Sequence, residues 1–178
     1  MKTLQDAFEH TLHDMYYAEN ALIKALPKVI SAVSNVPLRT ALQHHLDETK
    51  GQVKTLDQVF KSIGKAPKGE KCEAMEGLLK ECEGLIEDAK GPVAKHAVII
   101  AICQAIEHYE ISRYGTLREW AKELDEKVAH DLLSAILDQE KAADHTLTHI
   151  AVTTLNGGES TSTTTNSKQR PKAAPPAS

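Results

Sequence analysis

Apolar residues recur every three to four positions along most of the chain, and this spacing places them on one face of an α-helix. The first such stripe spans residues 3–33, and its apolar members are Phe8, Leu12, Met15, Leu22, Ile23, Leu26, Ile30 and Val33. Thr3 and Asp6 resemble a capping box and predict the first turn of this helix. Pro27 falls inside the stripe and is expected to bend the helix.

Three further stripes of the same kind predict three more long helices. The second runs from Pro37, which suits a first helical turn, to Gly64, which suits the position after a last turn. The third starts at Pro92, and the fourth ends at the Asn-Gly-Gly sequence at 156–158. A break at 123–126 separates these two stripes, and because it contains no glycine, only the change in the apolar pattern indicates it.

The connections between the stripes indicate how the helices are arranged. Short loops join the first pair and the last pair, so each pair is expected to be antiparallel. A long connection at 65–91 joins the pairs and carries a shorter acidic, amphipathic helix at about 72–90. We therefore expect an all-α, ferritin-like up-down-down-up four-helix bundle at residues 1–156, with an extra short helix in the long crossover. Residues 157–178 are rich in Ser, Thr and Pro and are predicted to be a disordered tail.

Composition and charge restrict the class of protein. The formal net charge of −4 over 178 residues, without a basic face, argues against a nucleic-acid-binding protein. No apolar stretch reaches about 18 residues, so no membrane span is expected, and the N-terminus lacks the apolar segment of a signal peptide. Cys72, Cys82 and Cys103 are odd in number and lack a CxxC spacing. This argues against a disulfide framework or a thiolate zinc site and favours a cytoplasmic location.

Several acids fall on the apolar faces of the predicted helices, where solvated acids are not expected. Glu19 lies in the middle of its apolar arc, with Met15 before it and Leu22 after it. Each of the four long helices carries at least one such acid near its middle, and together they are Glu19, Glu48, Glu107, Glu110, Glu140 and Asp144. Glu119 lies on the same helix as Glu107 but points away from the apolar arc, and it provides an internal control.

If the helices pack as expected, these six acids meet at one level of the interior. Burying an unpaired carboxylate costs on the order of several kcal/mol, so the group needs neutralisation. Two divalent cations can supply most of it, with protonation or a buried His45 covering the rest. A single glutamate in an apolar arc usually lies at its edge or pairs with a lysine, and an i,i+3 pair such as Glu107 and Glu110 is common on helix surfaces. The recurrence on four helices is what favours a two-metal site.

Histidines, a glutamine and tyrosines accompany these acids. His45 and Gln52 share the inward face with Glu48, and His45 could be a metal ligand, a hydrogen-bond donor to a ligand, or a satisfied core histidine. His108 flanks Glu107 at the edge of the arc and is expected to support a ligand rather than to be one. Near a redox metal, tyrosines can donate a proton or an electron, and the candidates are Tyr16 and Tyr114. Other histidines are expected on the surface, namely His44, His96, His130, His145 and His149.

Several short segments together carry a family resemblance. They are HDMYYAE at 13–19, HLDETKGQ at 45–52, CEAMEGL at 72–78, EHYEI at 107–111, YGTL at 114–117 and EKAAD at 140–144. With them, residues 1 to about 156 resemble the YciE/YciF group of bacterial ferritin-like stress proteins. The resemblance implies a rubrerythrin-like dimetal site, a homodimer and a role in the stress response. The paired Glu107 and Glu110 are similar to the paired glutamates of rubrerythrin.

One departure from the ferritin-like class concerns the metal ligands. That class carries Glu-x-x-His on two helices, whereas Glu48 is followed three positions on by Gly51, and Glu140 by Ala143. The substitutes that remain open for the histidine ligands are Gln52, Asp144, Glu110 and His45. A ligand shell dominated by oxygen favours two divalent ions of iron or manganese, with magnesium as an alternative.

The function that follows is that of a stress-response protein whose carboxylate-bridged dimetal centre handles a small oxidant, peroxide or oxygen, in a catalase-like or peroxidase-like reaction. The alternative is a non-catalytic helical bundle with a structural or metal-sequestering role. An iron-storing cage would need interfaces that the sequence does not show. Because the sequence lacks a four-cysteine electron-transfer site, a peroxidase cycle needs an external reductant, whereas a catalase cycle does not.

Overall fold

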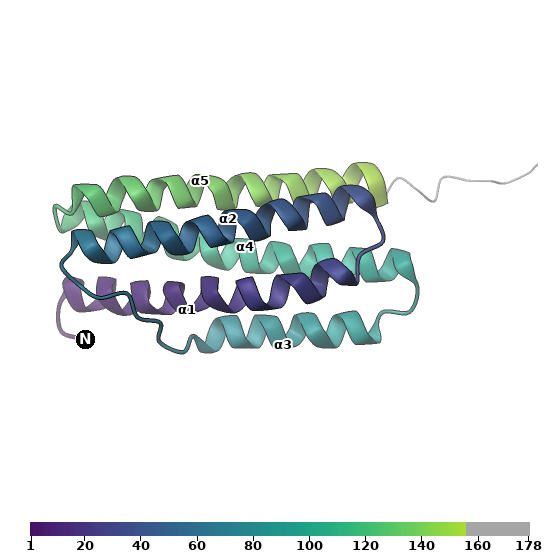
Figure 1. Cartoon of the computed structure of the whole chain (residues 1–178), viewed down its shortest axis with the longest axis horizontal. Coiled ribbons are helices and arrows are strands. Elements are labelled where there is room, and N and C mark those ends of the chain that lie inside the picture. Colours follow the sequence, from purple (N-terminus) through teal and green to yellow (C-terminus); the bar gives the residue numbers. More distant parts are fainter. Residues whose placement is uncertain (156–178) are drawn as a thin grey trace, which may run out of the picture.

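The computed structural model describes residues 1–155, and over this range the chain forms helices and turns without any strand (Figure 1). The five α-helices are α1 (Leu4–Ser31), α2 (Val36–Ser62), α3 (Glu73–Asp88), α4 (Pro92–Glu123) and α5 (Lys127–Ile150). A short π-helical segment, Ala151–Leu155, follows α5. The predicted all-α class is thus confirmed, while the predicted tail at 157–178 and the helix stop at 156–158 lie outside the described residues.

Four of the helices surround one interior. Figure 1 shows α1, α2, α4 and α5 side by side along the molecule, with α3 outside them. α1 and α2 run in opposite directions, as do α4 and α5, and the long connection through α3 leaves α2 and α4 parallel. Contacts join α1 to α2, α2 to α5, α5 to α4 and α4 to α1, and α3 packs mainly on α4. Residues near the middle of the four long helices can therefore meet, although they are far apart in sequence.

Local hydrogen bonds explain where two of the long helices begin. The Asp6 N–H donates to Thr3 Oγ1 (3.0 Å) and the Thr3 N–H donates to Asp6 Oδ2 (3.1 Å), which is the predicted capping box of α1. The Leu38 N–H donates to Asn35 Oδ1 (3.0 Å) and caps α2. α1 continues through Pro27, as expected. These caps fix the start of the two helices that carry Glu19 and His45.

The turn between α4 and α5 is closed without a glycine. Asp125 has a φ of 58°, in the left-handed region that few L-residues adopt and that Asp tolerates better than most. The Glu126 N–H donates to the carbonyl of Ala121 (2.8 Å) across this turn. After α2, by contrast, the left-handed position is held by Gly64 with a φ of 70°, as the sequence predicts.

The prediction that His96 lies on the surface is wrong. His96 is 5% exposed, and its Nε2 accepts hydrogen bonds from the backbone N–H groups of Ser34 (3.1 Å) and Asn35 (3.4 Å). Burial lowers the pKa of the His96 ring, which favours the neutral form that can accept these bonds. The side chain thereby ties α4 to the turn between α1 and α2, and a helical wheel cannot reveal such a partner.

The interior of the molecule is largely apolar, and its largest fully buried side chains include Phe8, Phe60 and Tyr114. The buried polar residues in the described range are Thr11, Glu19, His45, Thr49, Gln52, His96, Glu107, Glu110 and Glu140. Most of them belong to the site predicted from the sequence. The fold therefore places a cluster of ionisable side chains inside an apolar core, where their charge needs neutralisation.

Candidate metal centre

Four glutamates from three helices lie inside the apolar interior. Their relative exposures are between 0% and 2%, and they are Glu19 of α1, Glu107 and Glu110 of α4, and Glu140 of α5. Glu107 and Glu110 are about one turn apart, so both project from the same face of α4. α2 adds two further buried polar side chains, His45 and Gln52, which are 7% and 1% exposed. Four of the six acids predicted to point inward are thus fully buried.

These side chains carry polar atoms that no protein group satisfies. Within the described residues, the buried side-chain nitrogen and oxygen atoms without a hydrogen-bond partner are Glu19 Oε2, His45 Nδ1, Gln52 Oε1, Glu107 Oε2, Glu110 Oε1, Glu110 Oε2 and Glu140 Oε2. All belong to residues predicted for the site. Buried polar groups are normally paired, and an unpaired one costs roughly 1–3 kcal/mol, more when it is charged. Their concentration at one place fits a set of ligand atoms for a cation.

Three of these residues lie close enough together to share one ion. Ligand atoms of His45, Glu107 and Glu110 all lie within 4.8 Å of one another, and His45 Nε2 is 3.4 Å from Glu107 Oε1. An imidazole nitrogen with several carboxylate oxygens suits divalent iron or manganese. The donor set therefore fits the metal ions that the resemblance implies, and His45 offers the nitrogen that the absent Glu-x-x-His pattern would otherwise supply.

Burial also changes the protonation of the carboxylates. It raises the pKa of Glu107 to about 8, with the charges of neighbouring carboxylates adding to the increase. Burial, together with carboxylates nearby, raises the pKa of three further side chains well above the usual range, namely Glu19, Glu110 and Glu140. Near neutral pH, this cluster is therefore either partly protonated or neutralised by cations.

The ring of His45 is affected in the opposite direction. Burial lowers the pKa of His45 to about 4, and the nearby His44 contributes to the decrease. At neutral pH the ring is therefore uncharged, which is the form that binds a metal ion. His45 therefore contacts Glu107 as a neutral imidazole, and the two side chains do not form an ion pair.

Neighbouring hydrogen-bond donors orient two of the carboxylates. The hydroxyl of the fully buried Tyr114 donates to Glu19 Oε1. The Gln52 amide donates from Nε2 to Glu140 Oε1 (2.6 Å) and to Gln139 Oε1 (3.2 Å). The bonds to Glu19 and Glu140 each hold one carboxylate oxygen and leave the other oxygen unpaired. Such an arrangement positions a ligand while keeping an oxygen for a cation.

The remaining two predicted acids lie at the edge of the cluster. The side chain of Glu48 is 20% exposed and pairs with His44 (3.0 Å), and that of Asp144 is 23% exposed and pairs with His108 (3.3 Å). Both acids still contribute to the raised pKa of Glu107, so they lie near it. Whether they ligate a metal ion stays a prediction, as does the assignment of every other ligand.

The supporting residues expected from the sequence divide into two groups. His108, whose side chain is 68% exposed, reaches the cluster only through Asp144, which agrees with a supporting position. Tyr16 instead donates its hydroxyl to Asp57 (3.0 Å) and packs edge-on against Phe60, so its contacts lie away from the cluster. Of the two predicted tyrosines, only Tyr114 contacts a carboxylate of the cluster.

Other contacts of the cluster carry no signal in the sequence. Gln139 accepts from Gln52, and Gln104 donates to Asp144 (3.1 Å). Cys72, at the start of α3, contributes to the raised pKa of Glu110 and lies 3.0 Å from the Tyr109 hydroxyl through its Sγ. These residues come from helix edges or from the crossover, where the apolar periodicity says nothing about which side chains meet.

A cavity between α2 and α5 reaches the cluster. Its volume is about 330 Å³, and its lining includes His45, Glu48 and Glu107. Glu107 is only 2% exposed, and this cavity borders its otherwise enclosed side chain. Its lining also includes exposed residues of the two helices, among them Thr40 and Thr146.

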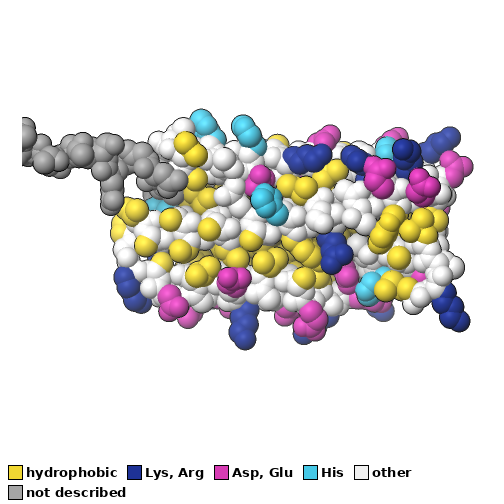
Figure 2. Space-filling model, turned by 180° about the vertical axis from the view of Figure 1, so that it is seen from behind, with side chains coloured by type: hydrophobic (Ala, Val, Ile, Leu, Met, Phe, Trp, Pro, Cys, Tyr) yellow, Lys and Arg dark blue, Asp and Glu magenta, His cyan; other side chains and the backbone are white. Residues whose placement is uncertain are grey.

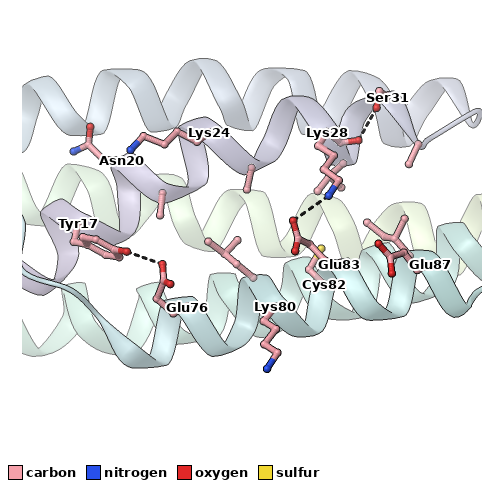
Figure 3. A pocket seen from close by; sticks show the side chains of 16 residues that line it. Tyr17, Asn20, Lys24, Lys28, Ser31, Glu76, Lys80, Cys82, Glu83 and Glu87 are labelled. Atoms are coloured by element: carbon pink, nitrogen blue, oxygen red, sulfur yellow. Dashed lines mark hydrogen bonds and ion pairs between the residues drawn. The ribbon is translucent and has the colours of Figure 1, made fainter.

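A larger cavity, of about 670 Å³, lies between α1 and α3 and contains none of the cluster residues (Figure 3). The Tyr17 hydroxyl donates to Glu76 Oε1 (2.6 Å) at one part of it, and Lys28 Nζ donates to Glu83 Oε1 (3.0 Å) at another. These contacts connect α3 to α1 across the cavity. The cavity between α2 and α5 is therefore the one that serves the candidate metal centre.

Comparisons with known proteins agree with this architecture. A family described as "Domain of unknown function (DUF892)" matches residues 3–158. Protein YciF of Escherichia coli (strain K12) is 43% identical over 157 residues, which cover 88% of this chain and 95% of YciF. The crystal structure of the E. coli stress protein YciF superimposes with a TM-score of 0.83 at 44% identity, over 85% of this chain and 96% of that one.

A second solved structure, YcfI from Rhodopseudomonas palustris, superimposes with a TM-score of 0.81 at 44% identity, over 83% of this chain and 94% of that one. No helix within residues 1–155 combines the length and apolar character that crossing a bilayer requires.

Proposed function

The chain belongs to the DUF892 family, and from this premise we propose that it is a stress-response protein whose interior holds two divalent metal ions, iron or manganese, and handles peroxide or oxygen. One observation carries the proposal: the unpaired buried side-chain atoms of the described chain gather on four facing helices. A stress role is what the name of the E. coli relative supports. Magnesium remains an alternative ion, because the donors are mostly hard oxygen atoms.

The architecture proposed for the site is the ferritin-like up-down-down-up four-helix bundle. Its support is the antiparallel pairing of α1 with α2 and of α4 with α5, together with the parallel relation of α2 and α4 across the long connection. In bundles of this type, carboxylates from each of the four helices hold two metal ions at mid-length. The long connection lets both pairs of helices present their acids at the same depth.

The proposed ligands are the four buried glutamates and His45, with Glu48 and Asp144 at the exposed edge. Glu107 lies closest to His45 and would hold a metal ion with it, and Glu110 lies one turn further along α4. Two redox-active ions bound here would supply two-electron exchange with a peroxide. The protein's own part is to supply negative charge, to keep the site enclosed and to hold each carboxylate in one orientation.

Tyr114 and Gln52 hold two of the carboxylates in one orientation through hydrogen bonds. The Tyr114 hydroxyl keeps its proton on the bond to Glu19, because burial and the surrounding carboxylates raise the pKa of Tyr114 well above its usual range. The Gln52 amide, which carries no charge, fixes Glu140 without neutralising it. Both groups therefore orient carboxylates and leave the negative charge available to cations.

Metal content and oxygen release together test the proposal. Protein purified from cells grown with iron or manganese is expected to hold two ions per chain by elemental analysis, and to lose them with a chelator. A catalase-like reaction releases oxygen from added hydrogen peroxide without a reductant, and a peroxidase-like reaction consumes peroxide only when a reductant is added. A chain without bound metal under all these conditions would contradict the proposal.

The second candidate is a non-catalytic helical bundle with a structural or metal-sequestering role. The R. palustris relative YcfI is named, provisionally, as a structural protein, and this name favours the second candidate. The same experiment separates the two, because this candidate predicts that metal removal lowers stability while the metal-loaded protein neither consumes peroxide nor releases oxygen.

A homodimer is proposed as the assembly. α4 is apolar on more than one side, and its outer face exposes Val93, Ala97, Ala101 and Ala105, spaced four residues apart. Figure 2 shows a band of apolar side chains along the face where α4 lies behind α1 and α2 in the view of Figure 1. A helix that is apolar all round is usually covered on all sides. A second copy of the chain is the proposed cover.

A further inference from the structure

The cavity between α2 and α5 offers more room than the smallest peroxide needs. Its volume of about 330 Å³ is roughly eleven times the ~30 Å³ that one water molecule occupies in the liquid. Hydrogen peroxide, with two oxygen atoms, would fill only a small part of that volume. A molecule that fills the cavity must therefore carry several carbon atoms.

The walls of this cavity are apolar and its inner end is polar. The apolar side chains that line it include Ala41, Leu42, Ala142, Ala143, Leu147 and Ile150. Alanines on both helices keep the space open where larger side chains would close it. The inner end is formed by His45 and Glu107, which belong to the metal-ligand cluster. A ligand would thus place an apolar group against the walls and a polar group beside the cluster.

The charges around the cavity select against an anion. Among the described residues that line it, none is Lys or Arg, and Glu48 and Glu107 are acids. His44 pairs with Glu48 (3.0 Å) at the exposed side, so this nearby basic group is already engaged. A carboxylate or phosphate on the ligand would find no Lys or Arg in the lining to pair with and would meet the carboxyl groups of Glu48 and Glu107. The ligand that fits best is uncharged.

We infer that this cavity binds the organic part of a small, uncharged organic hydroperoxide, with its peroxide group directed towards His45 and Glu107. The inference rests on the proposed function and names its substrate class. In the reaction the O–O bond breaks, and ROOH takes up two electrons and two protons to give ROH and water. An external dithiol supplies both electrons and both protons and becomes a disulfide.

A binding experiment tests the cavity without relying on turnover. The probe is 2-phenyl-2-propanol, the alcohol that corresponds to cumene hydroperoxide, titrated into the full chain as purified and followed by calorimetry. Ala143→Phe fills the cavity from α5 and Ala41→Phe fills it from α2, whereas Ala135→Phe is the control on an exposed part of α5 outside the lining. We expect both filled variants to bind the alcohol at least tenfold more weakly than the wild type and the control.

Kinetics with two peroxides then test the substrate class. With dithiothreitol as the dithiol, kcat/KM for cumene hydroperoxide is expected to fall in the filled variants at least tenfold more than kcat/KM for hydrogen peroxide, while Ala135→Phe changes neither. Alcohol binding that both filled variants retain, or equal losses for both peroxides, would overturn the inference. Turnover of hydrogen peroxide without turnover of cumene hydroperoxide would overturn it too and leave the proposed function standing. A chain that binds no metal and consumes neither peroxide would overturn both.

Discussion

The Tyr114 hydroxyl on α4 donates a hydrogen bond to Glu19 on α1, and both side chains are fully buried. The two residues are 95 positions apart in the sequence. Their contact joins α4, which carries Glu107 and Glu110, to α1, which carries Glu19. A carboxylate buried as deeply as Glu19 is costly unless a proton or a cation neutralises it.

Replacing Tyr114 with Phe removes only the oxygen that holds Glu19. If Glu19 is a metal ligand, the loss of this orienting bond should weaken metal binding by about 10–100-fold, the usual effect of removing a ligand's hydrogen-bond partner. Isothermal titration of the chelator-treated protein with manganese measures it. Tyr16→Phe is the matched control, because its hydroxyl bonds to Asp57 away from the cluster. Equal metal affinity in the two variants would argue against a supporting role for Tyr114.

His45 is expected to be the nitrogen ligand of the centre. His45→Asn removes the imidazole that lies within 4.8 Å of the ligand atoms of Glu107 and Glu110 and should lower metal affinity at least tenfold. His130→Asn is the control, since His130 lies near the surface of α5 and pairs with Asp131 (3.0 Å). Elemental analysis after equilibration at a fixed free manganese concentration compares them. An undiminished metal content in His45→Asn would remove His45 from the ligand set.

The stability of the metal-free protein should decrease as the pH rises from about 6.5 to 8. Glu107 has a folded-state pKa of about 8, against about 4.3 when unfolded, so the folded state holds more protons in this range and loses its advantage as pH rises. Below about pH 6.5 the lowered pKa of His45 has the opposite effect on stability. As the pH falls, the ring is protonated first in the unfolded state, so the folded state loses stability.

Urea unfolding of the chelator-treated protein at several pH values provides the measurement, and the metal-loaded protein is the comparison. Bound cations replace the protons, so the loaded form should lose much less stability over the same interval. A metal-free protein whose stability is flat or rises between pH 6.5 and 8 would show that the buried carboxylates keep ordinary pKa values.

Charge on the outer face of α4 should disrupt the proposed dimer. Ala101→Glu places a carboxylate in the middle of the exposed alanine series and should shift the protein from dimer to monomer in light scattering coupled to size exclusion. Ala135→Glu makes the same change on an exposed part of α5 and should leave the dimer intact. A wild-type protein that is monomeric at tens of micromolar would contradict the assembly.

Helical periodicity was sufficient to find the core of the candidate site. The positions of Glu19, Glu107, Glu110 and Glu140 in apolar arcs predicted burial, and all four are buried, because a residue's angle on a helix largely decides whether it faces the interior. Glu48 satisfied the same rule but lies at the edge, where His44 pairs with it from one turn before. A helical wheel gives the angle of a residue around its helix, but it gives neither the side-chain rotamer nor the residue that the side chain contacts.

Contacts between distant segments could not be predicted in the same way. His96 is buried because backbone N–H groups of the turn after α1 need an acceptor, and that turn lies 62 residues earlier in the chain. Asp125 occupies a left-handed position that sequence reasoning assigns to glycine or asparagine. The sequence therefore predicts the helices and the faces they bury, while turns and cross-helix partners depend on the tertiary structure.

Glu107 provides the most direct test of a metal centre in this interior. Its replacement by Gln preserves the volume of the side chain but removes the negative charge of a proposed metal ligand. Glu119→Gln is the matched control on the same helix, because Glu119 is exposed and pairs with Arg118 (2.6 Å). Circular dichroism of both variants should match the wild type.

The decisive measurement is the number of metal ions bound per chain in Glu107→Gln and Glu119→Gln after the same loading with iron or manganese. A metal centre that depends on Glu107 predicts two ions in the Glu119 variant and the loss of one or both in the Glu107 variant, with the helical fold retained in each. Equal metal content in the two variants would contradict it.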